Sequence, residues 1–177
     1  MIVEAEALDA YHRFTGFDPV TGAGDSGANM LDFMTKWKSM PVAGHTIKGF
    51  VAVDTRNLAL LAACANLFGC LMLGWDLPLA WQQADVWDVD PKGSTSGIWT
   101  PGSWGGHCTA SPAWSPQLVG VKTWTENKSA TVKAVPLYCP EAYAPVSEDT
   151  WAILQGTHCP SGVDVQKLMD LLPVVGN

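Results

Sequence analysis

Basic residues are scarce in this chain, and none of them cluster. Lysine and arginine together number 10 against 17 aspartates and glutamates, which gives a formal net charge of −7. Proteins that bind nucleic acids neutralise phosphates with a basic patch, and no stretch of this sequence supplies one. The composition therefore argues against a nucleic-acid binder, and we expect no polyanionic partner.

The signatures of membrane, metal and secretory proteins are also missing. No apolar run reaches the roughly 18 residues of a membrane span, and residues 1–6 lack the basic and then apolar pattern of a signal peptide. The five cysteines form no Cys-x-x-Cys pair and no zinc-type spacing with histidine. We expect no membrane association, no metal, no cofactor and a reducing, cytoplasmic compartment. The cysteines are Cys64, Cys70, Cys108, Cys139 and Cys159, and we expect most of these five to be buried free thiols.

Apolar residues, and tryptophan above all, are abundant instead. Apolar residues make up 47% of the 177 residues, enough for one domain spanning residues 1–177 with a core of its own. The sequence holds 9 tryptophans, each with a large ring and one N–H donor. They indicate either a core and rim built on aromatic rings or a stacking platform for a sugar or a peptide.

The spacing of apolar residues predicts helices in the N-terminal half and a β-rich half after them, an α+β fold with antiparallel strands. Helices are expected over 2–14, 27–38 and 56–67, the second capped by Asp25 or Ser26 and the third by Thr55. Strands are expected over 46–53, 70–77 and 118–124, and the second is apolar enough to be a central strand.

The other segments are less regular. Residues 78–103 show no periodicity and are expected to form one wall of a cleft. The prolines of 111–116 predict a turn or an irregular edge, and 125–128 predict a polar turn. Residues 131–143 favour no single element, 151–154 favour a short strand and 165–172 a terminal helix.

The stretch richest in chemistry runs Gly-Ser-Trp-Gly-Gly-His-Cys over residues 102–108. Gly105 and Gly106 carry no Cβ, so another group can approach His107 closely. Histidine is the side chain best suited to proton transfer near neutral pH. Cys108 is its neighbour on an expected strand, where adjacent side chains point to opposite faces, so we expect the thiol to point away from the imidazole.

This element, in the order of the other motifs, resembles the papain-like cysteine peptidases, and more narrowly the papain-like proteins of actinobacterial phages and prophages. The resemblance rests on Asp-Ser-Gly at 25–27, Asn-Leu-Phe-Gly-Cys at 66–70, Gly-Ser-Trp-Gly-Gly-His at 102–107, Thr-Trp at 123–124, Glu-Ala-Tyr-Ala at 141–144 and Ser-Gly-Val-Asp at 161–164. It implies thiol-dependent hydrolysis of a peptide or amide bond, with His107 as catalytic base and with Trp104, Gly105, Gly106 and Trp124 binding the substrate.

The chain departs from the family pattern at two points. The position two before Trp124, where the family has an asparagine that accepts a hydrogen bond from the imidazole, holds Lys122, which has no acceptor. The family's nucleophile-bearing helix has no counterpart before residue 25, so we expect an N-terminally short, degenerate or incomplete peptidase whose nucleophile would be an unexpected cysteine or come from another polypeptide.

Two other interpretations stay open. One is a non-catalytic, phage-derived binding or virion-associated domain with a groove lined by Trp99, Trp104 and Trp124. The other is an α+β domain whose Gly-Gly-His is only a tight strand entry. Because the missing helix would leave an apolar face open, we expect a homo-oligomer or a bound peptide or protein partner to cover it.

Overall fold

The computed structural model describes residues 4–124, 126–147 and 150. In this part of the chain the helices are α1 (Glu4–Thr15), α2 (Met30–Trp37), α3 (Leu58–Phe68) and α4 (Val135–Tyr138), with 3-10 turns η1 (Leu79–Trp81) and η2 (Gly97–Trp99). The strands are β1 (Ile47–Ala52), β2 (Leu71–Leu77), β3 (Val86–Trp87), β4 (Gly105–Trp114), β5 (Leu118–Thr123), β6 (Glu126–Thr131) and β7 (Glu141–Ser147). The fold is mixed α+β, as the sequence predicts.

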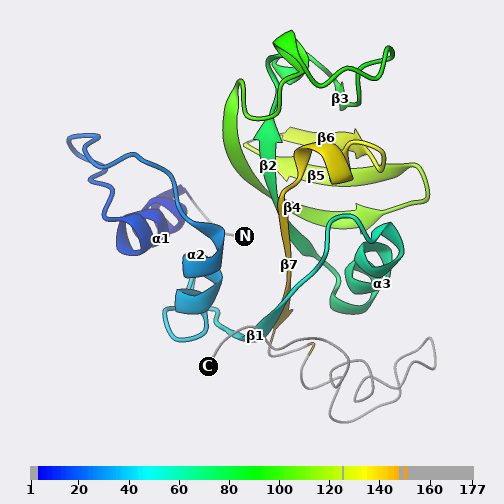
Figure 1. The fold of residues 1–177 in the computed structure, drawn as a ribbon. Helices are drawn as coiled ribbons and strands as arrows, with labels where there is room; N and C mark the ends of the chain where they lie inside the picture. The colour runs from blue at the N-terminus through cyan, green and yellow to red at the C-terminus, as the bar shows by residue number, and fades with distance from the viewer. Residues whose placement is uncertain (1–3, 125, 148–149, 151–177) are drawn as a thin grey trace.

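All of these strands join one sheet in the order β1-β7-β2-β4-β5-β6-β3 (Figure 1). Neighbouring strands are antiparallel, except that β3 pairs with β6 in parallel. The late strand β7 is inserted between β1 and β2, so the first and last strands of the described chain lie side by side at one end of the sheet.

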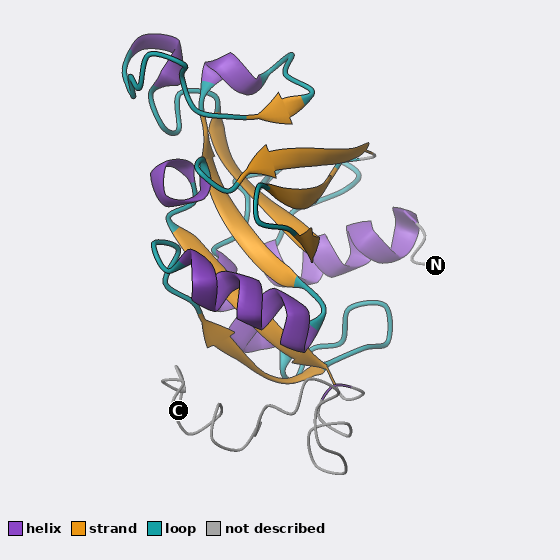
Figure 2. Cartoon of the chain, turned by 90° about the vertical axis from the view of Figure 1, so that its right-hand side faces the viewer, coloured by secondary structure: helices purple, strands orange, loops and turns teal. Residues whose placement is uncertain are grey.

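The sheet has a core on each face. Helix α3 covers one face, while α1 and α2 lie on the other (Figures 1 and 2). On the α3 face, Leu61 and Cys64 pack with Leu73 of β2 in the larger buried cluster. On the α2 face, Met30 and Met34 pack in a smaller cluster with residues of β1 and β7. No helix of the described residues is long and apolar enough to cross a membrane.

A block of tryptophans occupies the α3 face beside β2. Trp75, Trp81 and Trp87 are each at most 1% exposed. The rings of Trp81 and Trp87 stack 5.2 Å apart, and Trp75 meets both edge-on. Tyr138 packs on Trp81 and donates a hydrogen bond from its hydroxyl to the Trp99 carbonyl at 3.0 Å. These contacts anchor the irregular segment 78–103 to the sheet, and for these three tryptophans the structure confirms the core interpretation.

Two helix caps differ from the sequence prediction. Helix α2 begins at Met30 because Asn29, not Asp25 or Ser26, accepts a hydrogen bond from a backbone amide of its first turn. Asp25 instead accepts the Tyr11 hydroxyl at 2.8 Å. Helix α3 is capped by Asn57 rather than Thr55. It ends, as predicted, at Gly69, whose φ of 77° is the left-handed conformation that glycine tolerates best.

The β-rich half is more regular than predicted. Strand β4 runs through Pro112 to Trp114, because its register with β5 shifts between Ala110 and Ala113 and leaves the proline, which has no N–H, outside the ladder. The predicted turn at 125–128 is wrong where it is described, since β6 begins at Glu126. The segment that favoured no element holds α4 and the start of β7. The predicted strand 151–154 and helix 165–172, and Cys159, lie outside the described residues.

Candidate functional site

The Gly-Gly-His element opens β4, where the chain enters the middle of the sheet. The Trp104 amide donates to the Leu77 carbonyl at 2.8 Å, and Leu77 then pairs with Gly105. Gly105 has a φ of 140°, which side-chain-bearing residues rarely adopt, so glycine is needed at this entry. His107 pairs with Trp75, and directly opposed residues project to the same face, so His107 lies on the α3 side of the sheet.

Two residues from the end of β5 hold the His107 ring. Its Nε2 and the Thr123 hydroxyl share a hydrogen bond of 2.7 Å. The Trp124 ring lies 4.2 Å from the imidazole, at an interplanar angle of 14°. Burial of the ring lowers the pKa of His107 from the ordinary 6.5. The imidazole is therefore neutral at pH 7, the state in which it accepts a proton.

Trp124 is exposed over 58% of its surface, although large aromatic rings are usually covered. Its backbone φ is 41°, an uncommon value for a residue with a bulky side chain. The Trp104 ring lies 5.5 Å from the Trp124 ring, at an interplanar angle of 40°. We call these three side chains, Trp104, Trp124 and His107, the aromatic stack. Thr123 pairs with Glu126, so Trp124 lies in the tight turn between β5 and β6, and turns of this kind commonly require a positive φ. The exposure of its ring beside His107 makes the stack the strongest site candidate on this face.

The residue that orients His107 is the one that sequence reasoning overlooked. Lys122 pairs with Ala110, and alternation along the strand places both on the face opposite His107. Thr123, one residue further, faces the imidazole and is 2% exposed. Alternation along the strand separates Thr123 from Lys122, and the register of β4 against β5 is what assigns Thr123 to the histidine face.

The structure brings only part of the predicted tryptophan groove together. Trp124 contacts both the Trp104 ring and the His107 ring. Trp99 packs against the larger core, as Trp104 also does, and its carbonyl accepts the Tyr138 hydroxyl. Gly106 pairs with Asp76 and lines a separate hollow on the other face of the sheet.

Cys108 lies on the face opposite His107. It pairs with Gly74, whereas His107 pairs with Trp75. The structure leaves Cys108 exposed to solvent, unlike the buried thiol that the sequence predicts. Desolvation by the surrounding protein, together with the nearby Glu141 carboxylate, still raises the pKa of its thiol. The arrangement agrees with the expectation that this thiol points away from the imidazole.

The other described cysteines are not activated either. Burial raises the pKa of Cys139 to about 12 and that of Cys64 to about 11, and it also raises that of Cys70. Cys139 donates a hydrogen bond from its thiol to the Glu141 carbonyl at 3.2 Å. A nucleophilic cysteine needs a lowered pKa, so none of these thiols fits that role.

The hollow that Gly106 lines has a volume of about 590 Å³ and lies between the sheet and the α1–α2 region. Its floor has no side chain at Gly74 and Gly106, and it is flanked by Asp76, Cys108 and Glu141. We call it the glycine-floored hollow. It extends along β4 as far as His107, so the two candidate features adjoin each other from opposite faces of the sheet.

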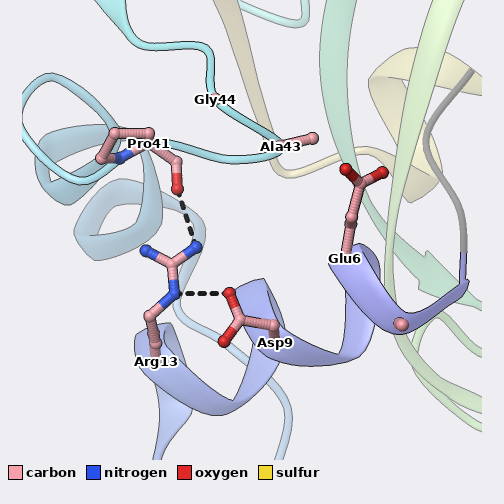
Figure 3. Close-up of a pocket in the computed structure, with 7 residues that line it drawn as sticks. Glu6, Asp9, Arg13, Pro41, Ala43 and Gly44 are labelled. Atoms are coloured by element: carbon pink, nitrogen blue, oxygen red, sulfur yellow. Dashed lines mark hydrogen bonds and ion pairs between the residues drawn. The ribbon is translucent and has the colours of Figure 1, made fainter.

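A further hollow, of about 400 Å³, lies between α1 and residues 41–44 (Figure 3). Arg13 there pairs with Asp9 at 2.9 Å and donates to the Pro41 carbonyl at 2.9 Å. Both contacts use the guanidinium group of Arg13, which thereby fixes α1 against the turn that contains Pro41. The lining of this hollow holds no thiol and no imidazole, and its carboxylate at Asp9 is paired with Arg13.

The chemistry available is thus a neutral imidazole with a fixed orientation, beneath an exposed aromatic ring. No group of three or more histidine, cysteine or acidic side chains within the described ranges is placed to hold a metal ion. A comparison with models of known protein families gives no match, and none of the curated proteins matches the chain.

Proposed function

We propose that this chain is a relative of the papain-like cysteine peptidases in which His107 is the proton acceptor of a thiol-dependent peptide or amide hydrolase. The observation that carries the proposal is the neutral His107 ring, hydrogen-bonded to Thr123 and covered by Trp124. In this role Thr123 supplies the oxygen partner that Lys122 cannot offer. The Gly-Gly-His strand entry and the Thr-Trp that follows it support the same assignment.

In such a reaction the imidazole takes the proton of a thiol, and the resulting thiolate attacks the carbonyl carbon of the scissile amide. The imidazolium then gives this proton to the departing amine as the C–N bond breaks. Water attacks the thioester, the imidazole accepts a proton from that water, and the acid and the free thiol are released. Each step requires a thiol within reach of His107.

The nucleophile has to lie outside the four cysteines that the structure describes. Their thiols have raised pKa values, and Cys108 lies on the wrong face of the sheet. It would therefore be Cys159 or a cysteine of another polypeptide. As it stands, the described part of the chain is the base-bearing part of a hydrolase, incomplete or degenerate.

The test is hydrolysis of fluorogenic peptide amides by the complete chain and three variants. We expect His107→Ala to lower turnover by about a hundredfold or more, the usual contribution of a general base. His45→Ala, a change at an exposed histidine, is the matched control and should leave the rate unchanged. Cys108→Ser should also leave it unchanged. Turnover that persists in His107→Ala, or that disappears in Cys108→Ser, would overturn the proposal. A chain that shows no turnover by itself would exclude Cys159 as the nucleophile and leave only a cysteine of another polypeptide.

The exposure of Trp124 favours a second function, a non-catalytic binding domain that uses the aromatic stack. A tryptophan face offers a large and rigid contact for a peptide or a sugar ring. Titration with short peptides and with glycan fragments should then show binding that Trp124→Ala abolishes. Ile98→Ala, at an equally exposed apolar residue (59%), should bind normally. Binding that survives in Trp124→Ala would exclude this function.

A further inference from the structure

We propose that the glycine-floored hollow binds a lysine or arginine side chain of a peptide ligand. The inference rests on the proposed function for one point only, that the ligand is a peptide. The cation preference itself comes from the hollow's own residues, on the face of the sheet opposite the aromatic stack.

Register fixes the floor of the hollow. Gly74 in the middle of β2 pairs with Cys108 on one side and with Glu141 on the other, so the three residues form a row on the same face. A Cβ at Gly74 would lie 2.7 Å from Glu141 Cγ and 3.0 Å from Met30 Sδ. The missing side chain is therefore what allows the Glu141 carboxylate to lie over the sheet and border the open space.

The Glu141 carboxylate is held with one oxygen available. Tyr143 donates a hydrogen bond from its hydroxyl to Oε2 at 3.0 Å, which fixes the side chain. Within the described ranges no donor reaches Oε1, the oxygen nearest the Gly74 floor. A carboxylate oriented in this way is ready to accept a charge-assisted hydrogen bond from a ligand.

Asp76 gives the hollow a second negative charge. It follows Gly74 by two positions on β2, so it lies on the same face, and none of the described groups donates a hydrogen bond to it. The lining contains no lysine or arginine, and its histidine, His107, is neutral at pH 7 because burial lowers its pKa. The acidic side chains of the lining, Asp76 and Glu141, therefore favour a cation in the hollow over an acidic ligand.

The walls suit the stem of a long basic side chain. Tyr11 and Phe33 face the hollow from α1 and α2, and Met30 and Met72 add flexible apolar surface. Lysine and arginine bury their methylene stems on such surfaces while the charged head contacts polar groups. The volume of about 590 Å³ lies within the range of small-ligand sites, roughly 300–1,000 Å³. Size, apolar walls and carboxylates together favour a basic side chain over a neutral one.

The test is isothermal titration of the complete chain with three acetylated, amidated pentapeptides that carry lysine, norleucine or glutamate at the centre of an alanine frame. We expect the lysine peptide to bind about tenfold tighter than the norleucine peptide, a difference that shrinks as salt rises. Glu141→Gln keeps the size and an acceptor for Tyr143, and it should bring the two affinities to within about threefold. Asp85→Asn removes an equal charge from an exposed site before β3 and should keep the preference.

Equal affinities for the lysine and norleucine peptides in the unmodified chain would overturn the inference. So would a lysine preference that survives in both Glu141→Gln and Asp76→Asn, provided that near-UV circular dichroism shows both variants folded. The proposed function is judged separately. Peptide binding or turnover that depends on Trp124 or His107 but shows no cation preference removes this inference alone, whereas turnover that ignores His107 removes the hydrolase and leaves the cation preference standing.

Discussion

The hydrogen bond between Thr123 and His107 gives a prediction whose size follows from the structure. Thr123→Val keeps the shape of a side chain that is 2% exposed but removes the hydroxyl that lies 2.7 Å from Nε2. A hydrogen bond of this kind contributes about 1 kcal/mol net, and an imidazole nitrogen left without a partner costs at least as much when it is buried. Because the ring is only half-buried, we expect the free energy of unfolding to fall by about 1–2 kcal/mol.

Urea denaturation of Thr123→Val, His107→Gln and the double variant forms a double-mutant cycle. We expect a coupling energy of about 1 kcal/mol between the two positions. Thr109→Val is the matched control. Thr109 is equally buried and accepts a hydrogen bond from the Trp75 indole at 2.9 Å, so its loss should destabilise the fold without coupling to His107. A coupling below about 0.3 kcal/mol for Thr123 and His107 would refute the idea that this threonine holds the ring.

Three further predictions concern the ring's charge, the floor of the hollow and the anchor of residues 78–103. Nuclear magnetic resonance should show His107 titrating below 6.5, since burial penalises its charged form. The unfolded chain then binds the proton more readily, so this group's contribution to stability should fall as pH drops below about 6.5; a midpoint above 6.5 would contradict the burial argument. Gly74→Ala should cost about 1–3 kcal/mol by forcing Glu141 aside, measured by urea denaturation, and an unchanged midpoint would contradict that geometry. Tyr138→Phe removes the 3.0 Å bond to the Trp99 carbonyl and should lower stability by about 1 kcal/mol; thermal unfolding and protease sensitivity within 78–103 that both stay unchanged would contradict the anchoring role.

The elements that the sequence predicts well are those with a strong local signal. The strand at Leu71–Leu77 is an almost uninterrupted apolar run. As this pattern predicts, it lies inside the sheet, between β7 and β4. Helix α3 has Gly69 directly after its last residue, and the chain turns there with positive φ. Local chemistry decides these features, so reading one segment at a time is sufficient.

Elements that depend on distant partners were missed. Strand β7 contains Pro145, and its sequence alone gives no reason to expect that it lies between β1 and β2. Strand β6 is polar, and it is stabilised by pairing with β5 rather than by its own residues. The cap at Asn29 was misassigned for a similar reason, since the competing Asp25 is already bonded to Tyr11 of another helix.

The candidate site divides in the same way. His107 and the opposite orientation of Cys108 follow from the motif and from strand alternation. The role of Thr123 required the register of β4 against β5, and the glycine-floored hollow is assembled from segments of α1, α2, β2, β4 and the start of β7. No pattern within a single segment encodes such a space.

The central claim, that His107 is a base whose nucleophile is none of the four described cysteines, is tested most directly by thiol reactivity. The folded protein is treated with limiting iodoacetamide at about pH 6, beside His107→Ala, and the labelled residues are mapped by mass spectrometry. A pKa raised to about 12 for Cys108 and Cys139 leaves them on the order of a thousandfold fewer thiolates than an ordinary cysteine. We predict that Cys64, Cys70, Cys108 and Cys139 all react slowly and that any fast thiol is Cys159, slowed in His107→Ala. Rapid labelling of one of the four, dependent on His107, would contradict the account.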